Sequence, residues 1–152
     1  MPRSPELALL ALQGFHVVFL LLHDWVPLGP LNDVSAVRRE NSLPHLIINS
    51  LLVAGLFAFG FGASVHFYGR VYPGWLHQWL FVSYGLLFLG EIRAWWIPYL
   101  VQPEPARAAR YQSMFGRTHA FLPVRNGMVP NTLHVMLHAA TLATVFLLSR
   151  MP

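Results

Sequence analysis

The chain has 152 residues, of which 55% are hydrophobic and only 11% are charged, whereas soluble domains carry about 25% charged residues. Its ten basic residues are all arginine and outnumber six acidic residues, giving a net charge of +4. In so apolar a chain we expect these arginines to face lipid headgroups, and we expect no nucleic-acid partner. The lack of cysteine excludes disulfides, thiolate metal sites and cysteine nucleophiles.

Four apolar stretches predict four membrane-spanning helices, at approximately residues 6–26, 45–68, 75–97 and 132–149. Each is about 20 residues long, the length that crosses ~30 Å of hydrocarbon at ~1.5 Å per residue. The spans use most of the chain, so we expect a single transmembrane domain over residues 1–152. The first stretch contains Gln13 and His16 and lacks a small-x-small cleavage site, so we expect a retained span and not a signal peptide.

The segments between the stretches predict an all-α fold, an antiparallel bundle of four transmembrane helices. Residues 69–74 form a short turn, whereas residues 27–44 and 98–131 are long polar connections on one side. Seven arginines belong to that side and three to the other. The seven are Arg38, Arg39, Arg93, Arg107, Arg110, Arg117 and Arg125, and the three are Arg3, Arg70 and Arg150. The positive-inside rule therefore places the long connections in the cytoplasm and both termini outside, in an inner (plasma) membrane of bacterial type.

The third connection has structure of its own. Glu104-Pro105 resembles a helix start, and we expect a short helix over Ala106–Phe115 that lies in the membrane interface. Asn126-Gly127 is typical of a turn. Asn131 is the expected N-cap of the last span.

Small residues lie on one face of the second stretch. Ala54, Ala58 and Gly62 follow one another at a spacing of four, which lets a neighbouring backbone approach closely. We expect this face to form a seam within the bundle, and a homodimer interface is the alternative.

Polar residues form a stripe on each predicted span at 100° per residue. The stripes are Gln13, His16, His23 and Asp24; His45, Asn49 and His66; His77, Tyr84, Glu91 and Trp95; and Asn131, His134, His138 and Thr141. Ionisable groups are costly in hydrocarbon, so we expect the stripes to face one another and to form a site in the cytoplasmic leaflet. Glu91 lies roughly 10 Å inside its span and must be protonated, paired or hydrated.

Two chemistries fit these residues. As acid/base groups, the catalytic candidates are Glu91, His23, Asp24, His134 and His138. As a metal site, His134-x-x-x-His138 places two imidazoles one turn apart, and Glu91, His45, His23 or Asp24 would complete a mononuclear Zn, Fe or Cu centre. Haem held by two histidines is a less favoured cofactor.

The remaining candidates would bind the ligand. Asn49 and Tyr84 would position it, and an anionic headgroup would be held at the entrance by Arg107, Arg110, Arg117, His119 and Arg125. The predicted function is an enzyme or binding protein for a hydrophobic small molecule that is lipid-, sterol- or quinone-like. The alternatives are a non-catalytic subunit of a larger membrane complex and a small proton-coupled transporter that acts as a dimer.

Overall fold

The structure, a computed structural model, describes residues 4–151 and contains helices but no β-strand within that range. Four helical spans of this part are long and apolar enough to cross a membrane: Pro5–Leu22, Leu43–His66, Gly74–Leu100 and Thr132–Arg150. The all-helical class and the four long apolar helices are thereby confirmed, whereas the antiparallel bundle arrangement stays a prediction. Arg3, which contributed to the predicted orientation, lies outside the described residues.

The long helices are α1 (Ser4–Leu22), α3 (Leu43–His66), α4 (Gly74–Glu91) and α7 (Thr132–Arg150). The third span continues past α4 through a π-helical segment, η2 (Ile92–Trp96), into α5 (Ile97–Leu100). The connections contain η1 (Gly29–Leu31), α2 (Val34–Glu40) and α6 (Pro105–Phe115). The sequence pattern predicted α6 but neither α2 nor the π-helical segment.

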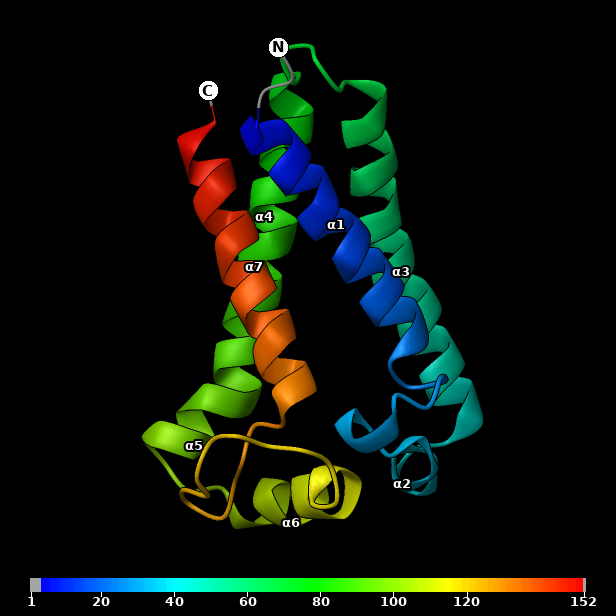
Figure 1. Ribbon diagram of the computed structural model, residues 1–152, viewed down its shortest axis with the longest axis vertical. Coiled ribbons are helices and arrows are strands. Elements are labelled where there is room, and N and C mark those ends of the chain that lie inside the picture. The colour runs from blue at the N-terminus through cyan, green and yellow to red at the C-terminus, as the bar shows by residue number, and fades with distance from the viewer. Residues whose placement is uncertain (1–3, 152) are drawn as a thin grey trace.

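In Figure 1, α1 lies beside α3 and α7, and α4 runs along α7. The start of α1, the turn at residues 69–74 and the end of α7 lie together, and we call this the turn end. Helices α2, α5 and α6 gather at the other end, which we call the loop end. The two long connections therefore share one end of the molecule.

The first helix ends at Leu22 and not near Val26 as predicted. The Asn32 side chain explains the difference, because it binds the chain that follows the helix. Its amide nitrogen donates to the carbonyl oxygens of His23 and Val26, at 2.6 and 2.9 Å, and its oxygen accepts from the Leu28 amide at 2.7 Å. His23 and Asp24 consequently lie in a folded-back segment beyond the helix.

The close approach between α3 and α4 is at Gly60. A Cβ on Gly60 would lie 2.9 Å from Leu80 Cδ2, whereas a Cβ on Gly62 would meet no atom within 4 Å. Ala54 is buried as expected, but the buried face of α3 continues through Phe57, Gly60 and Ser64. A repeat of 3.6 residues drifts away from a strict spacing of four, so the prediction that included Gly62 in the seam was wrong.

The helix, the turn and the cap predicted for the third connection are confirmed, whereas the position of the helix in the membrane interface stays a prediction. Pro105 opens α6. Asn126 and Gly127 both have positive φ, 52° and 73°, and form the turn between Arg125 and Met128, which exchange two backbone hydrogen bonds of 2.9 Å. Asn131 caps α7 by accepting a hydrogen bond from the His134 amide at 3.0 Å.

Candidate functional site

The residues predicted to form one site occupy three different places. A cleft at the loop end contains His23, Asp24, His45, Asn49, Arg110 and His134. Glu91 and Tyr84 lie in a buried network between the long helices. His138 lines a separate groove between α4 and α7.

The cleft has a volume of about 240 Å³ and is formed by six segments of the chain: the residues that follow α1, α2, the start of α3, η2, α6 and the start of α7. The six predicted polar residues line it. Apolar and aromatic side chains also line it, namely Val37, Leu46, Trp95, Tyr111, Met114 and Phe115. The cleft therefore suits a molecule that has both an apolar face and hydrogen-bonding groups.

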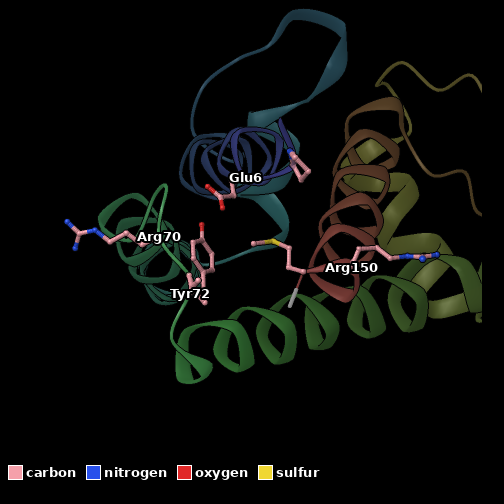
Figure 2. A pocket seen from close by; sticks show the side chains of 7 residues that line it. Glu6, Arg70, Tyr72 and Arg150 are labelled. Atoms are coloured by element: carbon pink, nitrogen blue, oxygen red, sulfur yellow. The ribbon is translucent and has the colours of Figure 1, made fainter. Parts of the chain in front are cut away.

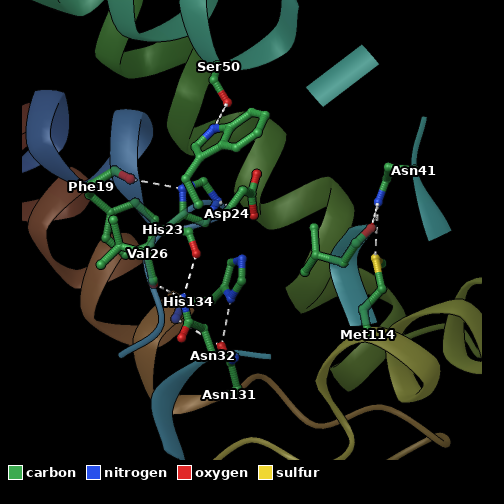
Figure 3. Close-up of polar contacts among 12 residues, drawn as sticks. Phe19, His23, Asp24, Val26, Asn32, Asn41, Ser50, Met114, Asn131 and His134 are labelled. Carbon is green, nitrogen blue, oxygen red and sulfur yellow. Dashed lines mark hydrogen bonds and ion pairs between the residues drawn. The ribbon is translucent and has the colours of Figure 1, made fainter. Parts of the chain in front are cut away.

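His134 is held in one orientation by Asn131 (Figure 3). The Asn131 amide nitrogen donates to Thr118 Oγ1 and to the Leu31 carbonyl oxygen, at 3.0 and 3.3 Å, so its Oδ1 is an acceptor. His134 Nδ1 lies 2.6 Å from that oxygen and must carry the hydrogen. The Nε2 atom of neutral His134 then presents a lone pair, and it has no hydrogen-bond partner among the described residues.

His23 and Asp24 form a pair in the cleft. His23 Nδ1 donates to the Phe19 carbonyl oxygen at 2.9 Å, and its Nε2 lies 3.2 Å from Asp24 Oδ1. With Nδ1 already a donor, this contact requires one proton between the two groups, as imidazolium with carboxylate or as imidazole with carboxylic acid. Burial raises the pKa of Asp24, and the charge of His23 opposes that rise. The rings of His23 and His134 are 6.1 Å apart.

An aromatic wall faces these polar groups. The Trp95 ring lies 4.5 Å from the His134 ring, 4.4 Å from Tyr111 and 5.3 Å from Phe115. Trp95 belongs to the π-helical segment, and such single-turn insertions are frequent at functional sites. Sequence reasoning did not assign Tyr111 and Phe115 to the site. Their i,i+4 spacing places both rings on one face of a predicted helix, but it does not tell which other segment of the chain packs against that face.

Only Arg110 of the predicted entrance arginines lines the cleft, where its guanidinium donates to Asn41 Oδ1 at 2.9 Å. Arg107 instead binds Glu104 Oε2 at 2.9 Å, and Arg93 binds the other oxygen at 3.0 Å. The hydrogen bond from Arg107 is the main cause of the lowered pKa of Glu104.

The other entrance residues lie away from the cleft. Arg125 stacks over the Tyr99 ring at 6.0 Å, and Arg117 is exposed on the surface. His119 Nδ1 is 2.7 Å from Thr132 Oγ1, and its backbone amide donates to the Pro30 carbonyl oxygen. These contacts fasten the third connection to the start of α7 and to the first connection.

Glu91 is buried, with 6% of its surface exposed, and lies in the interior between α1, α4 and α7. Thr141 Oγ1 lies 2.8 Å from Glu91 Oε1 and 3.0 Å from His16 Nε2. The His16 ring also packs against Tyr84, with centroids 5.0 Å apart. Glu91 Oε2 and the Tyr84 hydroxyl have no hydrogen-bond partner within the described part of the chain.

The groove that contains His138 has a volume of about 340 Å³ and is otherwise apolar, being lined by Phe88, Ile92, Trp96, Val135, Ala139 and Leu142. The rings of His134 and His138 are 6.2 Å apart. Within residues 4–151, no group of three His, Cys, Asp or Glu side chains is placed to hold a metal ion. The geometry therefore gives no support to the expected mononuclear centre.

A further cavity, of about 170 Å³, lies at the turn end and is lined by Pro5, Glu6, Arg70, Val71, Tyr72, Arg150 and Met151. In Figure 2 the side chains of Glu6 and Tyr72 approach the cavity, whereas those of Arg70 and Arg150 extend away from it.

No protein-family model matches the chain, and no match was found among curated proteins or solved structures. The functional argument therefore comes from the geometry of the chain itself.

Proposed function

We propose that the chain is an integral membrane protein whose four spans form an antiparallel bundle, with the loop end in the cytoplasm and both termini outside. The length and hydropathy of the four helices support the membrane location. The excess of arginine in the two long connections supports the orientation. Three residues of the short helix α6 that line the cleft, Tyr111, Met114 and Phe115, are aromatic or sulfur-containing, and this helix lies at the membrane surface.

Within this arrangement, the cleft binds a flat, lipid-soluble molecule that carries oxygen substituents on a ring, of the quinone-like class. One observation carries this proposal: a proton-holding pair, His23 and Asp24, and an acceptor, His134 Nε2, line the same cleft as the Trp95 wall. A planar ring stacks well on aromatic side chains, which favours a quinone-like ligand over a sterol or an acyl chain.

The polar groups define what the cleft can do with such a ligand. A ring carbonyl that replaces one partner of the His23–Asp24 contact accepts a hydrogen bond from the proton that the two groups share. A ring hydroxyl donates to His134 Nε2, which can take the proton as a general base. Arg110, Asn49 and His45 also line the cleft and orient the ligand's substituents. The protein thus binds the ligand and exchanges protons with it.

Quenching of tryptophan fluorescence by a short-chain benzoquinone or naphthoquinone tests this function in detergent solution. Saturable quenching is expected from the wild type. His134→Ala removes one hydrogen bond of about 1.4 kcal/mol and weakens binding about tenfold. His66→Ala is the matched control, because His66 is an exposed histidine at the far end of α3 and its loss leaves binding unchanged. Quenching that does not saturate, or that both variants weaken equally, contradicts the proposal.

A further inference from the structure

The buried contact between Glu91, Thr141 and His16 links three helices by side-chain hydrogen bonds. Glu91 on α4 and His16 on α1 do not bond each other directly. Both bond the single hydroxyl of Thr141 on α7, at 2.8 and 3.0 Å. Thr141 and His16 are fully buried. This network lies apart from the cleft, and none of its members lines that cleft.

The protonation of His16 follows from its second contact. His16 Nδ1 is 2.7 Å from the Leu12 carbonyl oxygen, which only accepts, so Nδ1 carries a hydrogen. His16 Nε2 is then a lone-pair acceptor when the ring is neutral and a donor when the ring is protonated. When Nε2 is an acceptor, the Thr141 hydroxyl must donate to it to make this bond; when Nε2 is a donor, the hydroxyl can donate to Glu91 or to the Leu137 carbonyl oxygen.

Thr141 Oγ1 also lies 3.0 Å from the Leu137 carbonyl oxygen, one turn back on α7. Its single hydroxyl hydrogen can therefore be donated to only one of Glu91, His16 and Leu137 at a time. If Glu91 is a carboxylic acid, it donates to Thr141, and Thr141 donates to neutral His16. If Glu91 is a carboxylate, it accepts from Thr141, and Thr141 accepts from protonated His16. If Glu91 is a carboxylate and His16 is neutral, both accept and the Thr141 hydroxyl can donate to only one of them. The other contact then joins two acceptor atoms without a hydrogen between them, which is costly in a buried site.

We propose that Glu91, Thr141 and His16 form a proton relay, in which one proton is shared between a carboxyl on α4 and an imidazole on α1. In the transfer, the Glu91 carboxyl proton passes from Oε1 to Thr141 Oγ1 while the Thr141 hydroxyl proton passes to His16 Nε2. The products are a carboxylate and an imidazolium, and the other ring hydrogen stays on His16 Nδ1, which donates it to the Leu12 carbonyl oxygen. No oxidant, reductant or metal takes part, and the number of protons is conserved.

The surroundings of the relay are compatible with this step. The rings that contact His16 are Phe15 on α1, Phe57 on α3 and Tyr84 on α4, and the buried Gln13 precedes His16 on α1. None of these side chains carries a charge at neutral pH. His138 lies one turn before Thr141 on α7. Gln13, Glu91 Oε2, the Tyr84 hydroxyl and His138 Nδ1 have no partner among the described residues. Buried polar atoms of this kind usually bond internal water, which gives the relay a route to exchange its proton.

Two spectroscopic signals of the wild-type protein test the relay. The first is the infrared carbonyl band of a protonated carboxyl group, assigned to Glu91 by its loss in Glu91→Gln. The second is the nitrogen NMR signal of His16. Because the transfer conserves the number of protons, pH does not drive it. At constant pH, a change of temperature should shift the proton between the two groups, so the Glu91 carbonyl band and the imidazolium signal of His16 should change together and in opposite directions. Signals that change independently in the wild type overturn the proposal.

The variants make the test specific. Thr141→Val removes the bridging hydroxyl at nearly constant volume, so the two signals should then change independently, whereas Thr141→Ser retains the hydroxyl and keeps them coupled. Glu91→Gln replaces the acid by a donor that cannot give up its proton, so the imidazolium signal that His16 shows in the wild type at the same pH should be lost. Glu104→Gln changes a surface carboxylate and should leave both signals unchanged. If Thr141→Val folds and its signals still change together, the hydroxyl is not the bridge and the proposal fails. Since quinone quenching reports only on the cleft, the relay and the proposed function can fail separately.

Discussion

The loop end and the turn end of the molecule both enclose a cavity with titratable side chains, but they hold those side chains differently. In the loop-end cleft, His134 is fixed by Asn131, and His23 by the Phe19 carbonyl oxygen and Asp24. At the turn end, Arg70 and Arg150 extend away from the cavity (Figure 2). The cleft thus orients its polar groups towards one another, whereas the turn end directs its strongest charges outwards.

The difference teaches that clustering of ionisable residues alone does not define a site. Groups that have defined donor and acceptor roles at fixed positions can bind a ligand selectively and transfer its protons. Arginines that extend from a helix end interact with headgroups instead. The following predictions compare matched residues at the two ends, beginning with the largest expected effect.

Removing a tryptophan should be far more costly at the loop end. Trp95 is 6% exposed and contacts Tyr111, Phe115 and His134, whereas Trp75 at the start of α4 is 51% exposed. Trp95→Ala should lower the free energy of unfolding by about 3–5 kcal/mol because it leaves a cavity. Trp75→Ala should lower it by less than about 1 kcal/mol. Unfolding by SDS titration from detergent micelles measures both, and equal losses would show that the aromatic wall is not a packed unit.

Removing a polar group should produce a smaller difference in unfolding free energy between the two ends. Asn131→Ala deletes a helix cap and three further side-chain hydrogen bonds, which should cost about 2 kcal/mol. Tyr72→Phe at the turn end deletes one hydroxyl whose hydrogen bond to the Ser64 carbonyl oxygen is 3.5 Å long, so the cost should be at most about 0.5 kcal/mol. The same SDS titration compares them. If Tyr72→Phe loses more unfolding free energy than Asn131→Ala, the turn end is not the more weakly fixed of the two ends.

The long elements of the fold could be predicted from the sequence because hydrophobic length is a local property. Four apolar stretches gave the four helices, Glu104-Pro105 gave the start of α6, and Asn131 gave the cap of α7. The early end of α1 was not predictable, since it depends on Asn32, a residue outside the stretch. The π-helical segment was missed because residues 92–96 have no local signal that distinguishes them from α-helix.

The composition of the cleft could be predicted only in part. Periodicity indicated that His23, Asp24 and His134 lie on the polar faces of their helices. It does not tell which residues of neighbouring helices lie at the same level in the bundle. Glu91 was therefore grouped with the cleft residues, although the structure places it against Thr141 and His16. The positions of Arg107 and Arg125 were also beyond reach, because their partners, Glu104 and Tyr99, are specified by the fold of the third connection.

The smallest expected effect is a difference in how the two ends respond to pH. Burial raises the pKa of Asp24 above its ordinary value of 3.8 and the pKa of Tyr72 above 10.0. A group whose pKa is raised by folding stabilises the protein fully below its unfolded pKa, and this contribution is lost as the pH rises through the folded pKa. The Asp24 contribution should therefore decline from about pH 4 upwards, and the Tyr72 contribution only above about pH 10.

Variants that do not titrate isolate these two contributions. The unfolding free energy of the wild type minus that of Asp24→Asn should fall as the pH rises from 4, and the same difference for Tyr72→Phe should stay constant until the alkaline range. Arg110 lines the cleft with Asp24, and the charge of His23 opposes the rise of the Asp24 pKa, so these positive charges reduce the slope without reversing it. A difference for Asp24→Asn that rises with pH would mean that its carboxylate is stabilised by these cations more than it is penalised by burial. The cleft would then hold a permanent ion pair, and His23 with Asp24 could not serve as a proton-exchanging pair.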